Sequence, residues 1–273
     1  MLNLVGDRIR LFEKPKSFLN EVSCFEKRGT MVVKNSLEER KQELEKRYLI
    51  DFKKLEEEQL KLAKDLIIKD KIDFSLAERF GGFDIVFLKN KILCCIIVCN
   101  KNFEVIDQAY VLEKIRFPYV PGFRNYREVP AMIAAAKKLN EKPDVIFVHS
   151  QGIMQRLDPA SHFGLSTGIP TIGVSDILVD CEIEGEVTRG ADILKQGKKV
   201  GKALMEKIGS KPLYISPGND ISIKTAYTLS KELVQLPHKH PEPLHLASKY
   251  THQVKKELLG IIVKDADISS FAP

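Results

Sequence analysis

The stretch FGGFDIVFLKNKILCCIIVCNKNFEVIDQAYVL, residues 80–112, decides the fold class of this chain. It holds three apolar runs of strand length, at residues 82–88, 92–100 and 104–112. Short polar links at residues 89–90 and 101–103 join these runs. The stretch therefore predicts three consecutive strands in an antiparallel meander.

Beyond the meander, strand patterns alternate with helical patterns. We expect strands at residues 145–149, 171–174, 182–189, 199–205 and 213–216, and helices at 129–139, 160–166 and 223–235. Three meandering strands followed by helix and strand units indicate an α/β fold with a ribonuclease-H-like mixed sheet flanked by helices. No Gly-x-Gly-x-x-Gly follows a strand, which argues against a dinucleotide-binding sheet.

The first 50 residues are expected to form an N-terminal extension, and residues 51–273 the main domain. Short β-like pieces at residues 2–4, 9–12 and 30–33 precede a stretch without Gly or Pro, residues 35–68. Its leucines largely keep to one helical face, which predicts a long amphipathic helix or two in line. Ser36 and Glu39 make a capping box if Ser36 is the N-cap. This helix could dock a protein partner.

The composition limits the classes of protein to consider. Lys and Arg number 43 against 37 Asp and Glu, a net charge of +6 that permits a polyanionic partner without demanding one. No apolar run approaches the roughly 18 residues of a membrane span, so we expect no membrane contact and a cytoplasmic location. Of the five cysteines, Cys94, Cys95 and Cys99 lie in an apolar run and are expected to be buried small hydrophobes rather than metal ligands.

The segment FPYVPGFRNYRE, residues 117–128, combines rigid turn chemistry with aromatics and arginines. Pro118 and Pro121 fix the backbone, so Tyr119 and Val120 should stand out as a stiff, short turn that could act as a wedge. Arg124 and Arg127 offer fork-shaped donors of the kind that bind phosphate. The alternative is a proline-bent loop with a solvated charge cluster.

Seven blocks in order resemble the endonuclease V family from about residue 51 to residue 258. They are GGFDIVF at 81–87, PYVPGF at 118–123 with RE at 127–128, KPDVIFV at 142–148, ASHFGL at 160–165, IPTIGV at 169–174, ISPG at 215–218, and LP at 236–237 with PEP at 241–243. The resemblance implies a ribonuclease-H-like sheet. It also implies a lineage of magnesium-dependent enzymes that nick nucleic acid on the 3′ side of deoxyinosine or inosine.

The resemblance implies two metal ligands, Asp84 and Glu128. Asp84 interrupts an apolar strand, where an unpaired carboxylate would be costly, and a hard cation such as Mg²⁺ or Mn²⁺ would satisfy it. Glu128 would share that ion from the helix after the wedge. The alternative for Asp84 is a carboxylate at a strand edge bonded to a backbone amide.

The chain departs from the family at positions of catalytic type. His149 stands where the family carries a third metal acid, Asp176 where it carries a lysine, and Asn219 where it carries a histidine. A further family histidine is absent from residues 154–156. The catalytic candidates are Asp84, Glu128, His149, Asp176 and Asn219.

Three explanations of these departures stay open. His149 could bind a metal, although imidazole suits zinc or manganese better than magnesium. Asp176, Asp158 or Asp180 could replace the missing carboxylate. Alternatively, the chain binds DNA or RNA, possibly inosine-containing or mismatched, without cutting it, since an Asp in place of the lysine adds negative charge beside a phosphate.

The family's fold implies further contacts with a flipped base. Glycines would let the backbone approach the base, and His162 would be a satisfied residue at a helix start near the lesion pocket. The candidate nucleic-acid-binding residues are Tyr119, Val120, Pro121, Gly122, Arg124, Arg127, Gly152, His162 and Gly218.

Overall fold

The computed structural model describes residues 30–205 and 209–269. The chain divides into two compact units, Met1–Ile50 and Asp51–Pro273. The first unit contributes one described helix, α1 (Thr30–Tyr48), and the other described elements belong to the second. The strand pieces expected at residues 2–4 and 9–12 lie outside the described residues, and the role of residues 1–50 as an extension stays a prediction.

The helical stretch expected at residues 35–68 consists of two separate helices, α1 and α2 (Phe52–Leu62). Leu49 takes the left-handed conformation with φ 54°, and α2 begins after Asp51, whose carboxylate accepts a hydrogen bond from Lys54 N at 2.9 Å. The capping box at Ser36 and the strand at residues 30–33 are wrong, because α1 already begins at Thr30. Residues 30–48 contain no Gly or Pro that would interrupt a helix, so the helix continues through them.

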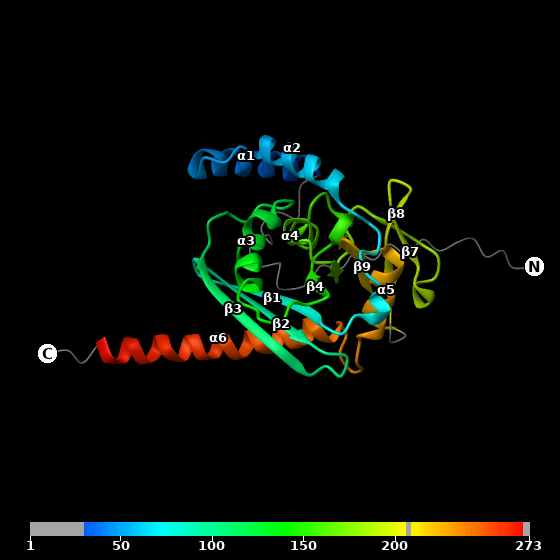
Figure 1. Cartoon of the computed structure of the whole chain (residues 1–273). Helices are drawn as coiled ribbons and strands as arrows, with labels where there is room; N and C mark the ends of the chain where they lie inside the picture. The colour runs from blue at the N-terminus through cyan, green and yellow to red at the C-terminus, as the bar shows by residue number, and fades with distance from the viewer. Residues whose placement is uncertain (1–29, 206–208, 270–273) are drawn as a thin grey trace, which may run out of the picture. The chain divides into compact units, whose positions relative to one another are not determined.

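In the described part of the chain, nine strands form one mixed sheet (Figure 1). Their spatial order is β3-β2-β1-β4-β5-β9-β8-β7-β6. The meander β1–β2–β3 is antiparallel, whereas β4 runs parallel to both β1 and β5, which confirms the ribonuclease-H-like layout. The strands are β1 (Phe80–Leu88), β2 (Lys91–Cys99), β3 (Val105–Lys114), β4 (Val145–His149), β5 (Thr171–Ser175), β6 (Glu182–Glu184), β7 (Asp192–Lys195), β8 (Lys198–Leu204) and β9 (Leu213–Asn219).

Strand β2 is buried along almost its whole length, because helices cover both faces of the sheet at this point. Cys94, Cys95 and Cys99 are free and fully buried, as expected for small hydrophobes. Burial raises the pKa of Cys95 to about 11 and that of Cys99 to about 12. These thiols are inert parts of the core.

The two faces of the sheet carry different helices (Figure 1). α3 (Arg124–Ala136) and α4 (Pro159–Thr167) pack on one face, and α5 (Ile223–Glu232) and α6 (Glu242–Ser269) pack on the other. α6 was not predicted, and α3 begins at Arg124 rather than at Val129, because the turn before it leads directly into the helix. The earlier start places Arg124 one turn from Glu128. None of the helices in the described ranges could span a bilayer.

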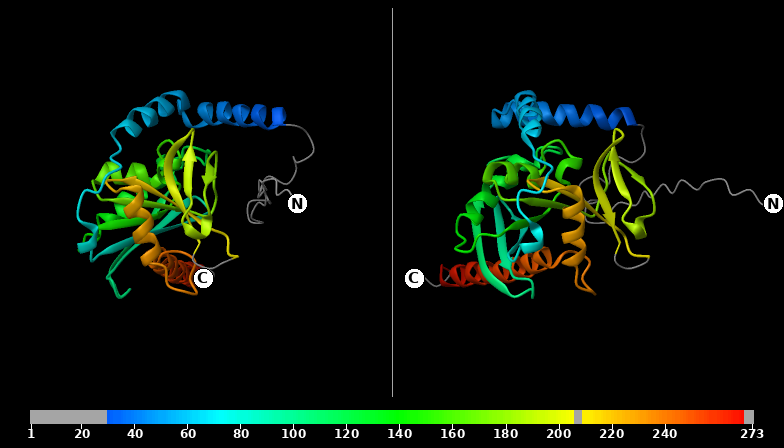
Figure 2. Two further views of the ribbon diagram at one scale, coloured as in Figure 1. Left: turned by 90° about the vertical axis from the view of Figure 1, so that its right-hand side faces the viewer. Right: turned by 45° about the vertical axis from the view of Figure 1, so that its right-hand side comes forward.

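At the edge of the sheet opposite β3, the structure has the hairpin β6–β7 where a single strand was expected. The strand expected at residues 182–189 ends at Glu184, since Gly185 takes a positive φ of 98°. The unpredicted β7 then pairs with β8, and Figure 2 shows these yellow strands at their edge of the sheet.

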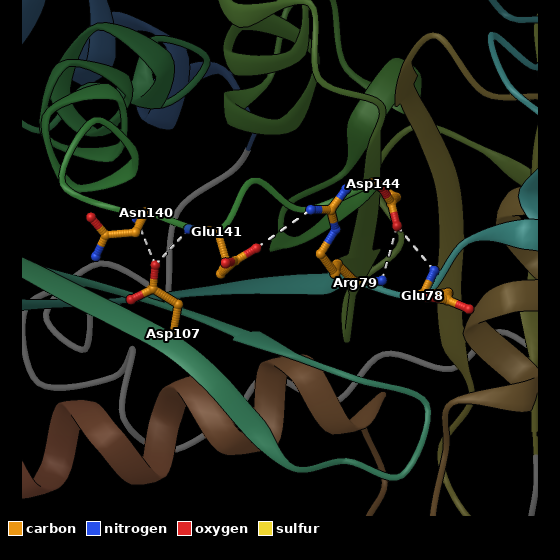
Figure 3. Close-up of polar contacts among 6 residues, drawn as sticks. All are labelled: Glu78, Arg79, Asp107, Asn140, Glu141 and Asp144. Carbon is orange, nitrogen blue, oxygen red and sulfur yellow. Dashed lines mark hydrogen bonds and ion pairs between the residues drawn. The ribbon is translucent and has the colours of Figure 1, made fainter.

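Polar contacts fix the beginning of β4 beside β1 (Figure 3). Asp144 accepts hydrogen bonds from the backbone N–H groups of Glu78 and Arg79, each at 2.9 Å, and pairs with the Arg79 guanidinium at 3.1 Å. Asp107 on β3 accepts hydrogen bonds from the backbone N–H groups of residues 140–141. These contacts set the position of β4 and therefore that of the residue at its end, His149.

Candidate functional site

Strands β1 and β4 bring Asp84 close enough to His149 for the carboxylate charge to act on the imidazole. The parallel ladder of these strands ends with the pair Gly82 and Phe147, and Asp84 and His149 each follow two residues later. Burial and the neighbouring His240 lower the pKa of His149 to about 4, although the charge of Asp84 opposes this shift. His149 is therefore neutral at physiological pH and can offer a lone pair.

A second carboxylate, that of Asp176, lies near His149 and directly follows the end of β5. Asp176 accepts hydrogen bonds from Lys239 Nζ at 2.5 Å and from His240 Nε2 at 2.9 Å, which hold its pKa well below the usual range. The rings of His149 and His240 meet edge to face with centroids 4.9 Å apart. The ligand atoms of His149, Asp176 and His240 lie within 4.8 Å of one another, so this cluster could hold a metal ion.

Glu128 is only 5% exposed, and both of its carboxylate oxygens are bound by Arg124. Arg124 Nε donates to Oε1 and Nη2 donates to Oε2, each at 2.9 Å, and Nη2 also donates to the backbone oxygen of His149 at 3.3 Å. Burial raises the pKa of Glu128, and the Arg124 guanidinium opposes that rise. A bidentate guanidinium thus supplies the positive charge that this buried carboxylate needs.

The two expected metal ligands, Asp84 and Glu128, belong to no common group of three or more potential ligands among the described residues. Phe83 packs against Phe163 of α4, with ring centroids 5.1 Å apart, so the next residue, Asp84, faces the opposite side of the sheet from α3 and α4. Within residues 30–205 and 209–269, the clusters of three potential ligands contain neither Asp84 nor Glu128. Mg²⁺ takes oxygen ligands, whereas the group that contains His149 offers two imidazoles and one carboxylate. The assignment of both residues as ligands stays a prediction.

Two other acids, Asp158 and Asp180, are possible replacements for the missing carboxylate. Asp158 is held by its own neighbours, since Oδ2 accepts hydrogen bonds from Ser150 Oγ at 2.7 Å and from Gln151 N at 2.5 Å. Burial raises the pKa of Asp158, while the charge of Arg124 opposes the rise. Asp180 is exposed in the loop after β5. Of the acids considered, Asp176 is the one that joins His149 in a potential metal cluster.

The expected wedge, residues 117–123, is a turn that a side chain of α2 holds in place. The expectation that Val120 stands out with Tyr119 is wrong, because its apolar side chain is packed in the core and is only 3% exposed. Gly122, with φ 84°, accepts a hydrogen bond through its carbonyl oxygen from Gln59 Nε2 at 2.9 Å. Pro121 is exposed, and Tyr119 is 44% exposed. A fixed turn with an exposed ring suits a wedge, and insertion into nucleic acid stays a prediction.

Two expected nucleic-acid contacts also support the local structure. Arg127 Nη1 donates to Phe117 O at 3.2 Å, and its guanidinium lies 4.3 Å from the Phe87 ring centroid. His162 Nδ1 lies 3.0 Å from Asn125 Nδ2, and burial lowers the pKa of His162. Their roles in binding nucleic acid stay predictions.

Gly152 and Gly218 lie at close approaches of the backbone. A Cβ on Gly152 would lie 2.5 Å from the carbonyl oxygen of Pro217, and its φ of 52° also favours glycine. A Cβ on Gly218 would lie 2.9 Å from the carbonyl carbon of Ala160. Close packing of the protein itself therefore explains both glycines, and their expected role as pocket walls stays a prediction.

Asn219 lies away from the His149 and Asp176 cluster. It pairs with Thr171 at the beginning of β5, whereas Asp176 follows the end of that strand. Its Oδ1 accepts a hydrogen bond from Ile67 N at 2.9 Å, so its side chain secures the segment before β1. Its catalytic role stays a prediction.

Sequence reasoning assigned no site residue to the stretch that leads from α5 into the beginning of α6. Residues 238–245, HKHPEPLH, contain three of the six histidines of the chain, and Lys239 and His240 from this segment bind Asp176. That density of histidines was the available signal.

Comparison with known proteins identifies the family of this chain. The family model described as Endonuclease V matches residues 60–249. Endonuclease V of Thermosipho melanesiensis is 37% identical over 182 residues, which cover 65% of this chain and 80% of that protein. Endonuclease V of Dictyoglomus turgidum is 35% identical over 207 residues, which cover 74% of this chain and 88% of that protein.

Solved structures agree with the sequence comparison. Endonuclease V of Streptomyces avermitilis superposes with a TM-score of 0.71 at 26% identity, covering 78% of this chain and 96% of that one. The Bacillus subtilis enzyme gives 0.70 at 28% identity, with coverage of 77% and 94%. Ciona intestinalis endonuclease V, solved with a DNA that contains an inosine, shares the fold with a TM-score of 0.68 at 22% identity, covering 76% and 98%. The chain belongs to the endonuclease V family.

Proposed function

We propose that this endonuclease V family member binds inosine-containing or otherwise irregular DNA or RNA and cleaves it weakly or not at all. The observation that carries the proposal is the bidentate pair of Arg124 and Glu128. The guanidinium already neutralises the carboxylate that the family resemblance assigns to a divalent cation. A cation at this place would have to displace a charge-assisted pair in a buried setting.

Two residues that differ from the family pattern, His149 and Asp176, also favour weak cleavage. His149 presents a neutral imidazole, which suits softer divalent ions than Mg²⁺. Asp176 carries a negative charge that Lys239 and His240 already bind. Cleavage of a phosphodiester needs positive charge where negative charge develops in the transition state. His149 and Asp176 supply less positive charge there than a bound metal ion and a lysine would.

Binding is supported by features that do not depend on the metal site. The net charge of +6 favours a polyanion, and the exposed Tyr119 on its anchored turn offers a ring for stacking on a base. The relative from Ciona intestinalis binds a DNA containing an inosine, which makes such substrates the first to try. The cytoplasmic location and a protein partner for the N-terminal helix stay predictions.

The test separates binding from cleavage. The full chain is incubated with labelled single- and double-stranded DNA and RNA, each with one inosine, and with matched oligonucleotides that carry guanosine instead. Binding is measured by fluorescence anisotropy, and cleavage by gel with Mg²⁺ and with Mn²⁺. Preferential binding of the inosine strands with little cleavage is expected. Efficient cleavage that Asp84→Asn abolishes would refute the weakened-cleavage part, and equal affinity for all strands would refute the binding part.

Tyr119→Ala should weaken binding of the inosine strands by about 1–3 kcal/mol, the usual contribution of one aromatic ring stacked on a base. Tyr119→Phe keeps the ring and should bind like the natural chain. Anisotropy titrations at one fixed salt concentration measure the effect, because phosphate contacts depend on salt. Equal affinities for the natural chain and Tyr119→Ala would make Tyr119 a loop residue without a role in binding.

Arg124→Met combined with His149→Asp should gain cleavage in Mg²⁺. The first change releases Glu128 from the guanidinium, and the second adds a carboxylate beside Asp84. Because groups that act together are not additive, each single change should show little gain. We expect the double variant to cleave roughly 10-fold faster or more than the natural chain.

A second measurement on the double variant does not depend on cleavage. Mg²⁺ should raise its melting temperature by binding the folded state, and should leave that of the natural chain unchanged. Adding Asp84→Asn to the double variant should remove both the gain in cleavage and the rise in melting temperature with Mg²⁺. A double variant that folds but responds to Mg²⁺ like the natural chain would show that Arg124 and His149 are not what excludes the ion.

A further inference from the structure

A second group of potential metal ligands lies at the beginning of α6, apart from the cluster around Asp176. It consists of His238, Glu242 and His245, whose ligand atoms lie within 4.8 Å of one another. Glu242 and His245 are three residues apart in α6 and so share one side of the helix, and His238 precedes the helix. The family resemblance assigns no role to these three residues.

The chemistry of the group suits a divalent ion of the zinc class. Glu242 is 5% exposed, and its Oε1 lies 2.5 Å from His238 Nδ1. The rings of His238 and His245 stack with centroids 3.6 Å apart and an interplanar angle of 19°. Two imidazoles and one carboxylate are a donor set that Zn²⁺ accepts.

The geometry is close to what an ion requires. Ligand atoms around a tetrahedral Zn²⁺ lie roughly 3.4 Å apart, given Zn–N and Zn–O bonds of about 2.0–2.2 Å. The donor atoms lie within 4.8 Å of one another, so binding an ion requires the two imidazole rings to turn about their Cβ–Cγ bonds and close this spacing. The side chain of His238 is 38% exposed, which gives an ion a route from solvent.

We propose that His238, Glu242 and His245 form a binding site for Zn²⁺ or a similar divalent transition metal, with water as the fourth ligand. The cluster around Asp176 is the weaker candidate for such an ion, because the Lys239 ammonium lies 2.5 Å from Asp176 Oδ1 and competes for that carboxylate. No ammonium is paired with Glu242 in the described part of the chain.

Backbone hydrogen bonds already hold both ends of the segment that carries the proposed site. Glu242 N donates to Leu233 O at 2.8 Å, and His238 N donates to Gln235 O at 2.8 Å. A metal would tie His238 to the helix and so fix the residues between them, Lys239 and His240, which bind Asp176. The ion would therefore stabilise the segment that reaches the family's candidate site.

The experiment uses the full chain without an affinity tag, stripped of metal with a chelator. Zn²⁺ binding is measured by calorimetry and by metal analysis after desalting, and Co²⁺ serves as an absorbance probe of the ligand set. His238→Ala and His245→Ala test the site. Two matched controls are His252→Ala, an exposed histidine on the same helix, and His240→Ala, which removes a member of the other cluster.

The natural chain and both control variants should bind a single Zn²⁺ with similar affinity. His238→Ala and His245→Ala should each weaken binding about 100-fold or more, since loss of even an outer partner of a metal ligand typically costs 10–100-fold. Circular dichroism confirms that each variant is folded, and Glu242→Gln gives a third ligand change. Absence of zinc binding in the natural chain would overturn the proposal. Binding that only His240→Ala removes would also overturn it and assign the metal to the cluster around Asp176.

Discussion

Arg124→Met is expected to lower the free energy of unfolding by about 3 kcal/mol. The change keeps the apolar stem but leaves the Glu128 carboxylate buried without its bidentate partner. Breaking a buried ion pair by removing one member costs about 3–5 kcal/mol, and the lower end applies because the Arg124 side chain is 36% exposed. Urea denaturation followed by circular dichroism measures the change.

The double variant Arg124→Met with Glu128→Gln is the control. Removing both charges should restore most of the lost stability, because replacement of a whole buried pair is often close to neutral. A double variant as unstable as Arg124→Met would show that packing of the arginine stem, rather than its charge, holds this region.

The destabilisation of Arg124→Met should depend on pH with a definite sign. Burial raises the pKa of Glu128 in the folded state, so the folded protein binds this proton more tightly than the unfolded chain does. Stability is therefore lost as the pH rises through that folded pKa, and loss of the opposing guanidinium enlarges the effect. The penalty should shrink on acidification. A penalty independent of pH would contradict an ionised Glu128.

Gly82→Ala is expected to destabilise the protein by about 3 kcal/mol, at the upper end for an overpacked core. A Cβ at this position would overlap the carbonyl group of Pro243 and lie 2.9 Å from Leu244 N. Both contacts are with backbone, which cannot rotate away as a flexible side chain can. The beginning of α6 would have to move off β1.

Gly260→Ala is the matched control for this change. Gly260 lies in α6, and a Cβ there would meet nothing within 4 Å. Replacement by alanine in a helix should raise stability by about 0.5–1 kcal/mol, the opposite sign from Gly82→Ala. Melting curves of both variants provide the comparison. A Gly82→Ala variant as stable as the natural chain would mean that α6 is not held closely against β1.

Several parts of the fold could be read from the sequence because they depend on neighbours along the chain. The strands β1, β2 and β3 are apolar runs with short polar links, and such local patterns suffice to predict a meander. The rigid turn at Tyr119 follows from its two flanking prolines. The order of the seven motifs indicated the family.

The pairing of Arg124 with Glu128 was accessible only in the folded chain. The sequence favoured a helix from Val129, and the helix begins at Arg124, so the guanidinium reaches the carboxylate one turn later. From the sequence alone, Arg124 is a candidate for binding phosphate and Glu128 is a candidate for binding a metal.

The clusters around Asp176 and Glu242 depend on tertiary structure for the same physical reason. His149, Asp176 and His240 come from β4, from the end of β5 and from the segment before α6, far apart in the sequence. The sequence determined which chemical groups this protein carries and where its strands lie. Which of those groups meet was decided by sheet register and by packing of α6 on β1, because contacts between distant residues depend on the whole core rather than on local propensity.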